Sequence, residues 1–123
     1  MEYNEDKITE RIINCIIKVH QTLGPGFLEN IYRKSLIIEL RKNNLKFENE
    51  KEIIVSYEGI EVGRHRLDLL VENKIVIELK TVDELSKAHY AQLKSYLKAT
   101  GLQVGILVNF SAAKADYRRV EIN

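Results

Sequence analysis

Two apolar segments joined by residues 72–74 constrain the fold of this chain more than any other feature of its sequence. Residues 61–71 and 75–80 both show the alternation expected of a strand, so together they predict a β-hairpin. A two-residue loop would set polar side chains of the second strand among the apolar ones of the first. A three-residue loop pairs Val71 with Ile75 and leaves one face entirely apolar. Because a one-residue slip reverses every side chain, burial selects the three-residue loop.

This register has a chemical consequence for Asp68, which it sets opposite Glu78, with Lys80 one pleat away on the same face. Carboxylates in facing positions have Cβ atoms about 4.5–5.5 Å apart and repel each other. Both also have apolar neighbours, among which an unpaired charge is costly. A divalent cation would resolve the conflict, so the pair predicts a site for a hard metal ion. The hairpin alone is also compatible with a solvated face on which Glu78 and Lys80 form an ordinary ion pair.

The rest of the chain predicts two helices before this hairpin and one after it. Apolar residues recur at helical spacing over residues 8–23 and 28–42, which a Gly-Pro-Gly sequence separates. A β-branched strand over 52–57 precedes the hairpin. A helix over 86–100 leads into a strand over 103–110, whose apolar composition indicates cover on both faces. These elements predict an α/β domain with helices on a mixed central sheet, in the order ααβββαβ.

Three details of this prediction concern single segments. Gly101 is expected to close the third helix in a left-handed conformation. Residues 1–7 and 111–123 are expected to be less ordered tails. The second helix is expected to bury one stripe of side chains, consisting of Leu28, Ile31, Tyr32, Leu36 and Leu40.

The composition indicates one folded domain over residues 1–123, since 45% of the residues are hydrophobic and 30% are charged. The single cysteine, Cys15, excludes an internal disulfide and a thiolate zinc site, and its helical stripe indicates a small buried side chain. No signal peptide or membrane-spanning run is visible, so a soluble cytoplasmic protein is expected. The net charge of +1 excludes nucleic-acid binding by charge alone, which leaves a local patch, a metal ion or a partner.

Three motifs resemble those of one superfamily of nucleases. Asp68 and, beyond the turn, Glu78-Leu79-Lys80 resemble the signature of the PD-(D/E)XK nucleases, with Leu67 in place of the Pro. Residues 92–96, Gln-Leu-Lys-Ser-Tyr, are similar to the Gln-x-x-x-Tyr helix motif of the RecB-like branch. Residues 26–32 match the Gly-x-x-Glu-x-x-Tyr motif of the GxxExxY proteins, a small prokaryotic family placed in the same superfamily. The similarity covers most of the chain.

The resemblance implies a restriction-endonuclease-like core and a metal-dependent nuclease site. It implies that Asp68, Glu78 and the backbone carbonyl of Leu79 ligate Mg²⁺ or Mn²⁺, which would activate a water and stabilise charge on phosphodiester oxygens. Lys80 would orient that water or neutralise the developing charge. Glu29 would be an outer metal or water ligand, although a carboxylate in the first turn of a helix is also favourable by itself.

The helix over 86–100 places His89, Gln92 and Tyr96 on one face. The resemblance implies that Gln92 and Tyr96 belong to the catalytic site, where they would hold Lys80, a water or a phosphate. The candidate nucleic-acid contacts are Arg64, Arg66, His89 and Lys94. The two arginines share the face of Asp68, where they would either contact phosphates or balance the carboxylates.

The sequence thus predicts a Mg²⁺-dependent nuclease that hydrolyses phosphodiester bonds in DNA or structured nucleic acid, with DNA favoured over RNA. Since many nucleases cut two strands by pairing, a homodimer or a larger complex is also expected. The alternative is a non-catalytic nucleic-acid-binding or protein-interaction module that retains the nuclease fold. The near-neutral net charge favours this alternative, whereas the complete set of site residues favours the enzyme.

Overall fold

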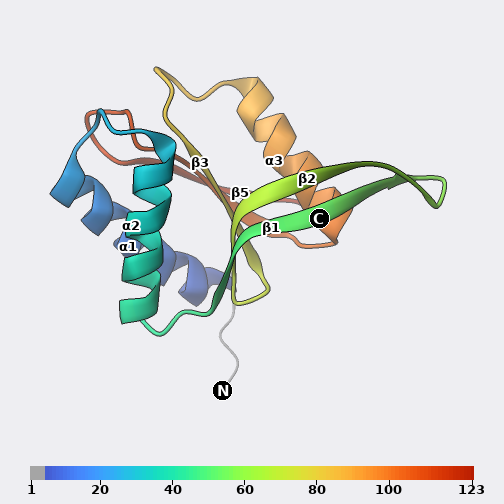
Figure 1. The fold of residues 1–123 in the computed structure, drawn as a ribbon, viewed down its shortest axis with the longest axis horizontal. Coiled ribbons are helices and arrows are strands. Elements are labelled where there is room, and N and C mark those ends of the chain that lie inside the picture. Colours follow the sequence, from blue (N-terminus) through green and yellow to red (C-terminus); the bar gives the residue numbers. More distant parts are fainter. Residues whose placement is uncertain (1–4) are drawn as a thin grey trace.

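The computed structural model describes residues 5–123, which form a five-stranded sheet flanked by three helices (Figure 1). The helices are α1 (Glu5–Leu23), α2 (Glu29–Lys42) and α3 (Lys87–Thr100). The strands are β1 (Phe47–Tyr57), β2 (Ile60–Val71), β3 (Ile75–Lys80), β4 (Val104–Asn109) and β5 (Asp116–Glu121). This arrangement confirms the predicted α/β class and the order ααβββαβ, to which it adds one C-terminal strand.

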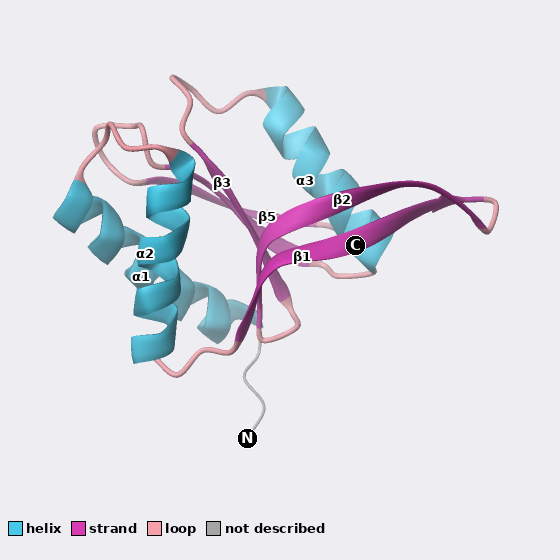
Figure 2. Ribbon diagram, viewed as in Figure 1, coloured by secondary structure: helices cyan, strands magenta, loops and turns pink. Residues whose placement is uncertain are grey.

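The strands are ordered β1-β2-β3-β4-β5 across the sheet. All neighbours are antiparallel except β3 and β4, which run parallel and are connected through α3. The central strands β3 and β4 are buried almost throughout. Figure 2 shows α1 and α2 together, separated from α3 by the sheet. Both faces of the central strands are therefore covered, as their apolar sequences predict.

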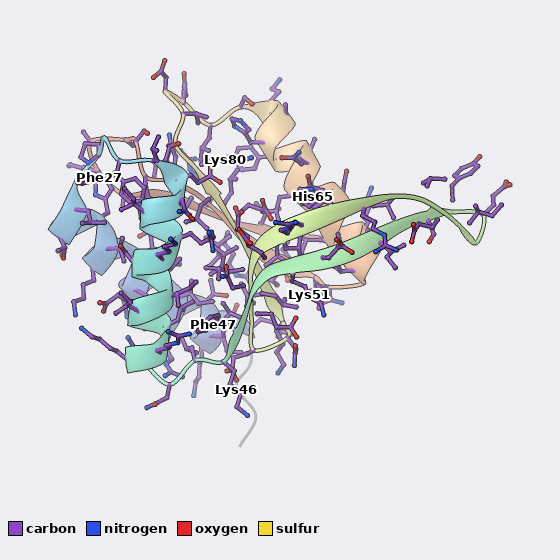
Figure 3. The ribbon with its side chains drawn as sticks, viewed as in Figure 1. Phe27, Lys46, Phe47, Lys51, His65 and Lys80 are labelled. Carbon is purple, nitrogen blue, oxygen red and sulfur yellow. The ribbon has the colours of Figure 1, made fainter. Side chains whose placement is uncertain are left out.

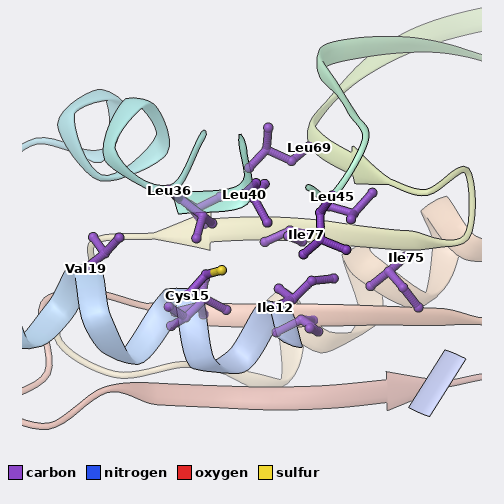
Figure 4. Packing of buried hydrophobic residues seen from close by; sticks show 14 of the residues in the cluster. Ile12, Cys15, Val19, Leu36, Leu40, Leu45, Leu69, Ile75 and Ile77 are labelled. Atoms are coloured by element: carbon purple, nitrogen blue, oxygen red, sulfur yellow. The ribbon is translucent and has the colours of Figure 1, made fainter. Parts of the chain in front are cut away.

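The core consists of two clusters, one on each face of the sheet. Ile75 and Ile77 of β3 pack with Leu36 and Leu40 of α2 and with the apolar stripe of α1 (Figure 4). Val76, which points to the opposite face, packs in the second cluster under α3. The alternation along β3 is thus the predicted one. Glu78 lies two residues after Val76 and therefore on the same face of the strand, so its carboxylate points toward the α3 side of the sheet.

The register between β2 and β3 also confirms the prediction. Val71 pairs with Ile75 and Leu69 with Ile77, across the three-residue turn 72–74. The ladder ends at Leu69, where β2 separates from β3 and continues with β1 as a long hairpin that projects from the body (Figure 1). A register shift between Val55 and Ser56 interrupts the pairing of β1 with β2, and such a bulge increases twist.

Two predictions of burial are wrong. Leu28 is 77% exposed and Ile31 is 41% exposed, because α2 carries apolar residues on two faces and only one faces α1 and the sheet. Leu28 also lies outside the helix, with extended backbone at its N-cap. The buried stripe is Tyr32, Leu36, Ile37 and Leu40. Leu67 lies two residues before Leu69, so a flat strand would place both on one face, but Leu67 packs in the cluster under α3 because the hairpin twists where β2 leaves β3.

The tails hold more structure than expected. Glu5, Asp6 and Lys7 form the first turn of α1, whereas residues 1–4 lie outside the described part of the chain. Residues 116–121, for which no element was predicted, form β5 at the sheet edge beside β4. Across residues 5–123, no helix has both the length and the apolar character needed to cross a bilayer.

Candidate active site

Asp68 and Glu78 meet at the point where β2 separates from β3. The Leu79 backbone N–H donates to Asp68 Oδ2 at 2.8 Å, and the Asp68 N–H lies 3.4 Å from Glu78 Oε1. Each carboxylate therefore contacts a backbone N–H of the opposite strand just beyond the last ladder pair. These two contacts hold the carboxylates side by side, as the predicted register requires.

Burial makes this pair electrostatically unfavourable when both groups are charged. Glu78 is only 5% exposed, and loss of hydration, followed by the charge of Asp68, raises its pKa to about 8. Burial also raises the pKa of Asp68, although the Leu79 N–H and the charge of Lys80 favour its anion. Glu78 thus holds its proton to a higher pH than an ordinary glutamate, and its hydrogen bond with Asp68 lowers the pKa of that neighbour.

Lys80 and Glu29 lie around this pair. The Lys80 charge lowers the pKa of all three carboxyl groups, and its Nζ lies 3.4 Å from Gln92 Oε1 on α3. Burial, and then the charge of Asp68, raises the pKa of Glu29 at the start of α2. Among the described residues, none of these carboxylates forms an ion pair. The lysine is therefore near enough to act through its field but does not neutralise the pair.

Tyr96 is nearly buried on α3 and stacks on His65 of β2, with ring centroids 3.7 Å apart and planes 15° apart. Burial, and then the charges of Glu78 and Asp68, raise the pKa of Tyr96 to about 12, which places its hydroxyl in the field of the carboxylates. Figure 3 labels His65 on β2 and Lys80 at the end of β3. The α3 residues Gln92 and Tyr96 thus lie near Lys80 and the carboxylates, respectively.

His65 is a site residue that the sequence did not predict. Its Nε2 is buried with no hydrogen-bond partner within residues 5–123, and burial lowers its pKa. Asp68 follows His65 by three residues, so in a flat strand the two side chains would point to opposite faces. The twist of the hairpin turns His65 toward α3, so alternation alone could not find it. The only sequence signal is a histidine near the predicted metal-binding Asp68.

The four candidate nucleic-acid contacts are not brought together into one patch. Arg64 pairs with Glu52 at 2.7 Å and with Glu61 at 3.2 Å, and Arg66 pairs with Glu50 at 3.5 Å. The arginines therefore balance carboxylates of the hairpin and do not neutralise Asp68 or Glu78. The other two candidates lie on α3.

His89 and Lys94 occupy different environments on α3. His89 Nδ1 accepts a hydrogen bond from the Ser86 N–H at 2.9 Å, and the Ser86 hydroxyl in turn accepts from the His89 N–H at 3.4 Å. This reciprocal pair is a capping box that fixes the start of the helix. Lys94 is exposed, and no ion pair involves it within the described chain. The observed contacts of His89 are thus those of a helix cap.

The carboxylate pair fits a hard divalent cation chemically. Asp68 and Glu78 present oxygen donors, compete for a single proton and have no ion-pair partner in residues 5–123. No group of three or more His, Cys, Asp or Glu side chains in this part of the chain is arranged to hold a metal. Glu29 therefore lies outside the pair, and the coordination shell would need main-chain and water oxygens as well.

Comparison with known proteins identifies a family and a similar fold. The family model described as the PD-(D/E)XK nuclease superfamily matches residues 6–120. The crystal structure of SSO0001 is similar with a TM-score of 0.60 at 24% identity, over 95% of this chain and 58% of that chain. At this identity the likeness shows the fold alone, and this chain spans little more than half of that protein. No curated protein matches the sequence.

Proposed function

The chain belongs to the PD-(D/E)XK nuclease superfamily, and from this premise we propose that it is a metal-dependent nuclease that hydrolyses phosphodiester bonds in DNA or structured nucleic acid. The observation that carries the proposal is the pair formed by the buried Glu78 and the half-buried Asp68, which lacks any ion-pair partner in residues 5–123. Two adjacent carboxylates, one buried and one half-buried, are costly in a protein that has no use for them. A nuclease needs such a pair to bind a cation.

Asp68, Glu78 and the backbone carbonyl of Leu79 would hold Mg²⁺ or Mn²⁺ in this proposal. The bound ion would supply Lewis acidity toward a phosphodiester oxygen and lower the pKa of a water. Glu78 must lose its proton for the pair to bind the ion, and the Leu79 N–H keeps Asp68 oriented throughout. Glu29, held near Asp68 by α2, would accept a hydrogen bond from a water at the edge of the site.

Lys80 is the residue that would act on the attacking water and on the charge that develops at the phosphate. Its ammonium group has a contact to Gln92 Oε1, which limits the positions that the flexible side chain can take. Tyr96 borders the carboxylates and has its ring fixed by His65. Gln92 would therefore position the lysine, and the nearly buried Tyr96 would exclude water from its side of the carboxylates. His89 and Lys94 of α3 would contact the nucleic-acid backbone.

The finer family placement is part of the proposal. Gly26, Glu29 and Tyr32 occupy the named positions of the GxxExxY motif. The Tyr32 hydroxyl donates to the Gly24 carbonyl at 2.5 Å and accepts from the Phe27 N–H at 3.2 Å. The motif tyrosine therefore closes the loop that precedes Glu29, which gives a structural reason for this spacing. We infer that the chain is a GxxExxY protein and that residues 1–123 form a single nuclease-like domain.

The test is calorimetric titration of Mg²⁺ and Mn²⁺ into the parent and into Asp68→Asn, at pH 8.5. Asn keeps the shape and the acceptor for the Leu79 N–H, so the variant should fold but lose most of its metal affinity. Asp83→Asn, at an exposed position, is the matched control and should bind as the parent does.

Cleavage of single-stranded, duplex and branched DNA and of RNA then identifies the substrate. Metal-dependent cleavage that survives in Asp68→Asn would exclude the proposed site. Metal binding with salt-sensitive nucleic-acid binding but without any cleavage would instead favour the non-catalytic module.

A further inference from the structure

The β1–β2 hairpin ends in an apolar tip that no residue in 5–123 covers. Tyr57, Ile60 and Val62 are 67%, 68% and 63% exposed, and the hairpin carries them beyond the rest of the molecule (Figure 1). Large apolar side chains grouped in this way mark interaction surfaces. The turn of the hairpin carries Glu58, whereas the neighbouring Glu61 is paired with Arg64. Glu58 makes no ion pair with any described residue.

A groove that fits such a tip lies between the same hairpin and the C-terminal half of α3. It consists of two adjoining cavities that share Ile54 and Ala99. Its apolar lining comprises Ile53, Ile54, Leu67, Leu70, Ala99 and Leu102. Lys51 and Lys98 stand on its rim. Lys51 is paired with Glu48 at 3.2 Å, whereas Lys98 has no ion-pair partner among the described residues.

We propose that this groove receives the hairpin tip of a second copy of the chain, so that two copies exchange tips across a two-fold axis. The charges are complementary, because the unpaired Glu58 would meet the unpaired Lys98 of the other copy. The hairpin carries the apolar tip and also forms one wall of the groove, whose other wall is α3. A two-fold axis through that hairpin therefore satisfies both contacts at once and closes the assembly as a dimer.

Two further observations favour this occupant. β1 is the edge strand of the sheet, and its outer backbone groups have no strand partner in the described chain. An exposed edge of this kind accepts an added strand from another chain. β1 is also paired with β2 from Phe47 to Tyr57, except at Glu50 and at the register shift between Val55 and Ser56, and the paired strands hold the tip away from the body that contains its own groove (Figure 1). The tip must find the groove of another molecule.

The charge contact gives a direct test by sedimentation equilibrium, from micromolar to submillimolar protein in EDTA and without nucleic acid. The parent should dimerise. Glu58→Lys and Lys98→Glu should each weaken dimerisation by about tenfold, because like charges then face each other in both contacts. The double variant should restore the affinity to within about twofold of the parent. Glu84→Lys, exposed and remote from the groove, is the control for net charge.

Ile60→Ser tests the apolar contact and should give a folded monomer, as judged by circular dichroism and urea unfolding. A parent that stays monomeric throughout the concentration range would overturn the proposal. So would a dimer that Ile60→Ser leaves intact, or a double charge variant that associates no better than the single ones. Assembly that grows beyond the dimer would overturn the two-fold arrangement. The result is independent of catalysis, since neither the metal nor the substrate is present.

Discussion

Replacing Glu78 by Gln should stabilise the metal-free protein at neutral and alkaline pH but not near pH 5. The folded pKa of Glu78 is about 8, against an ordinary value of 4.5. Between these values the folded chain holds a proton that the unfolded chain has lost. Stability therefore falls as the pH rises through this window and levels off above it. Gln cannot ionise, so the variant escapes this loss.

The size of the effect follows from the width of that window. Each pH unit costs about 1.4 kcal/mol, so the full window corresponds to roughly 4–5 kcal/mol as an upper bound. Local relaxation and water entry reduce the cost of a buried charge, so a difference of about 2–3 kcal/mol at pH 8 is expected. At pH 5 the two proteins should differ by less than about 1 kcal/mol.

The assay is urea unfolding at pH 5, 6, 7 and 8 in EDTA, followed by circular dichroism. Glu84→Gln removes the same charge from an exposed position and should give a curve parallel to the parent. If the pH dependence of the unfolding free energy of Glu78→Gln is also parallel to that of the parent, the pKa of the buried carboxylate is not raised and the reasoning is wrong. Added Mg²⁺ should restore stability to the parent at pH 8 by binding the folded state, and should do much less for Glu78→Gln.

Three further perturbations test other parts of the structure. Tyr32→Phe removes the hydroxyl bonded to the Gly24 carbonyl and should cost about 1–2 kcal/mol of unfolding free energy in urea. Gly105→Ala would place a Cβ 2.9 Å from Leu93 Cδ1, so the buried Leu93 side chain must move and thermal unfolding should show a loss of about 1–3 kcal/mol. Lys80→Ala removes the charge that lowers the pKa of the two central carboxyl groups. Metal binding in this variant should therefore require a higher pH than in the parent, as calorimetry at pH 7 and 8.5 would show.

The central part of the fold follows from the sequence because one local choice has a large energetic consequence. Only the three-residue loop keeps the apolar side chains of Leu69, Val71, Ile75 and Ile77 on one face, and the structure has this register. The adjacency of Asp68 and Glu78 is a direct result of it. Gly101 likewise has φ 74°, the left-handed conformation predicted for the end of α3.

Other features depend on contacts that no local pattern reveals. Ile31 has the spacing of a buried residue, but α2 meets its neighbours through another face. The strand at 116–121 carries mostly polar residues, with Val120 alone buried, because it covers the edge of β4. His65 reaches Tyr96 only through the twist of the hairpin. In each case the structure is decided by contact with a residue far away in the sequence, which local strand or helix propensity and the spacing of apolar residues could not identify.

The point beyond Leu69 where β2 separates from β3 also divides the molecule into a part that can vary in length and a part that cannot. The position of Asp68 is set by turn 72–74 and by the β2–β3 pairs up to Leu69. These lie at the end of β2 that is far from the hairpin tip. Pairs of residues added or removed around Gly59 would extend or shorten the projecting hairpin without moving the carboxylates. An engineer could therefore graft a different hairpin onto this chain and keep the arrangement of Asp68 and Glu78, the proposed metal site. The chemistry would stay fixed while the reach of the molecule changed.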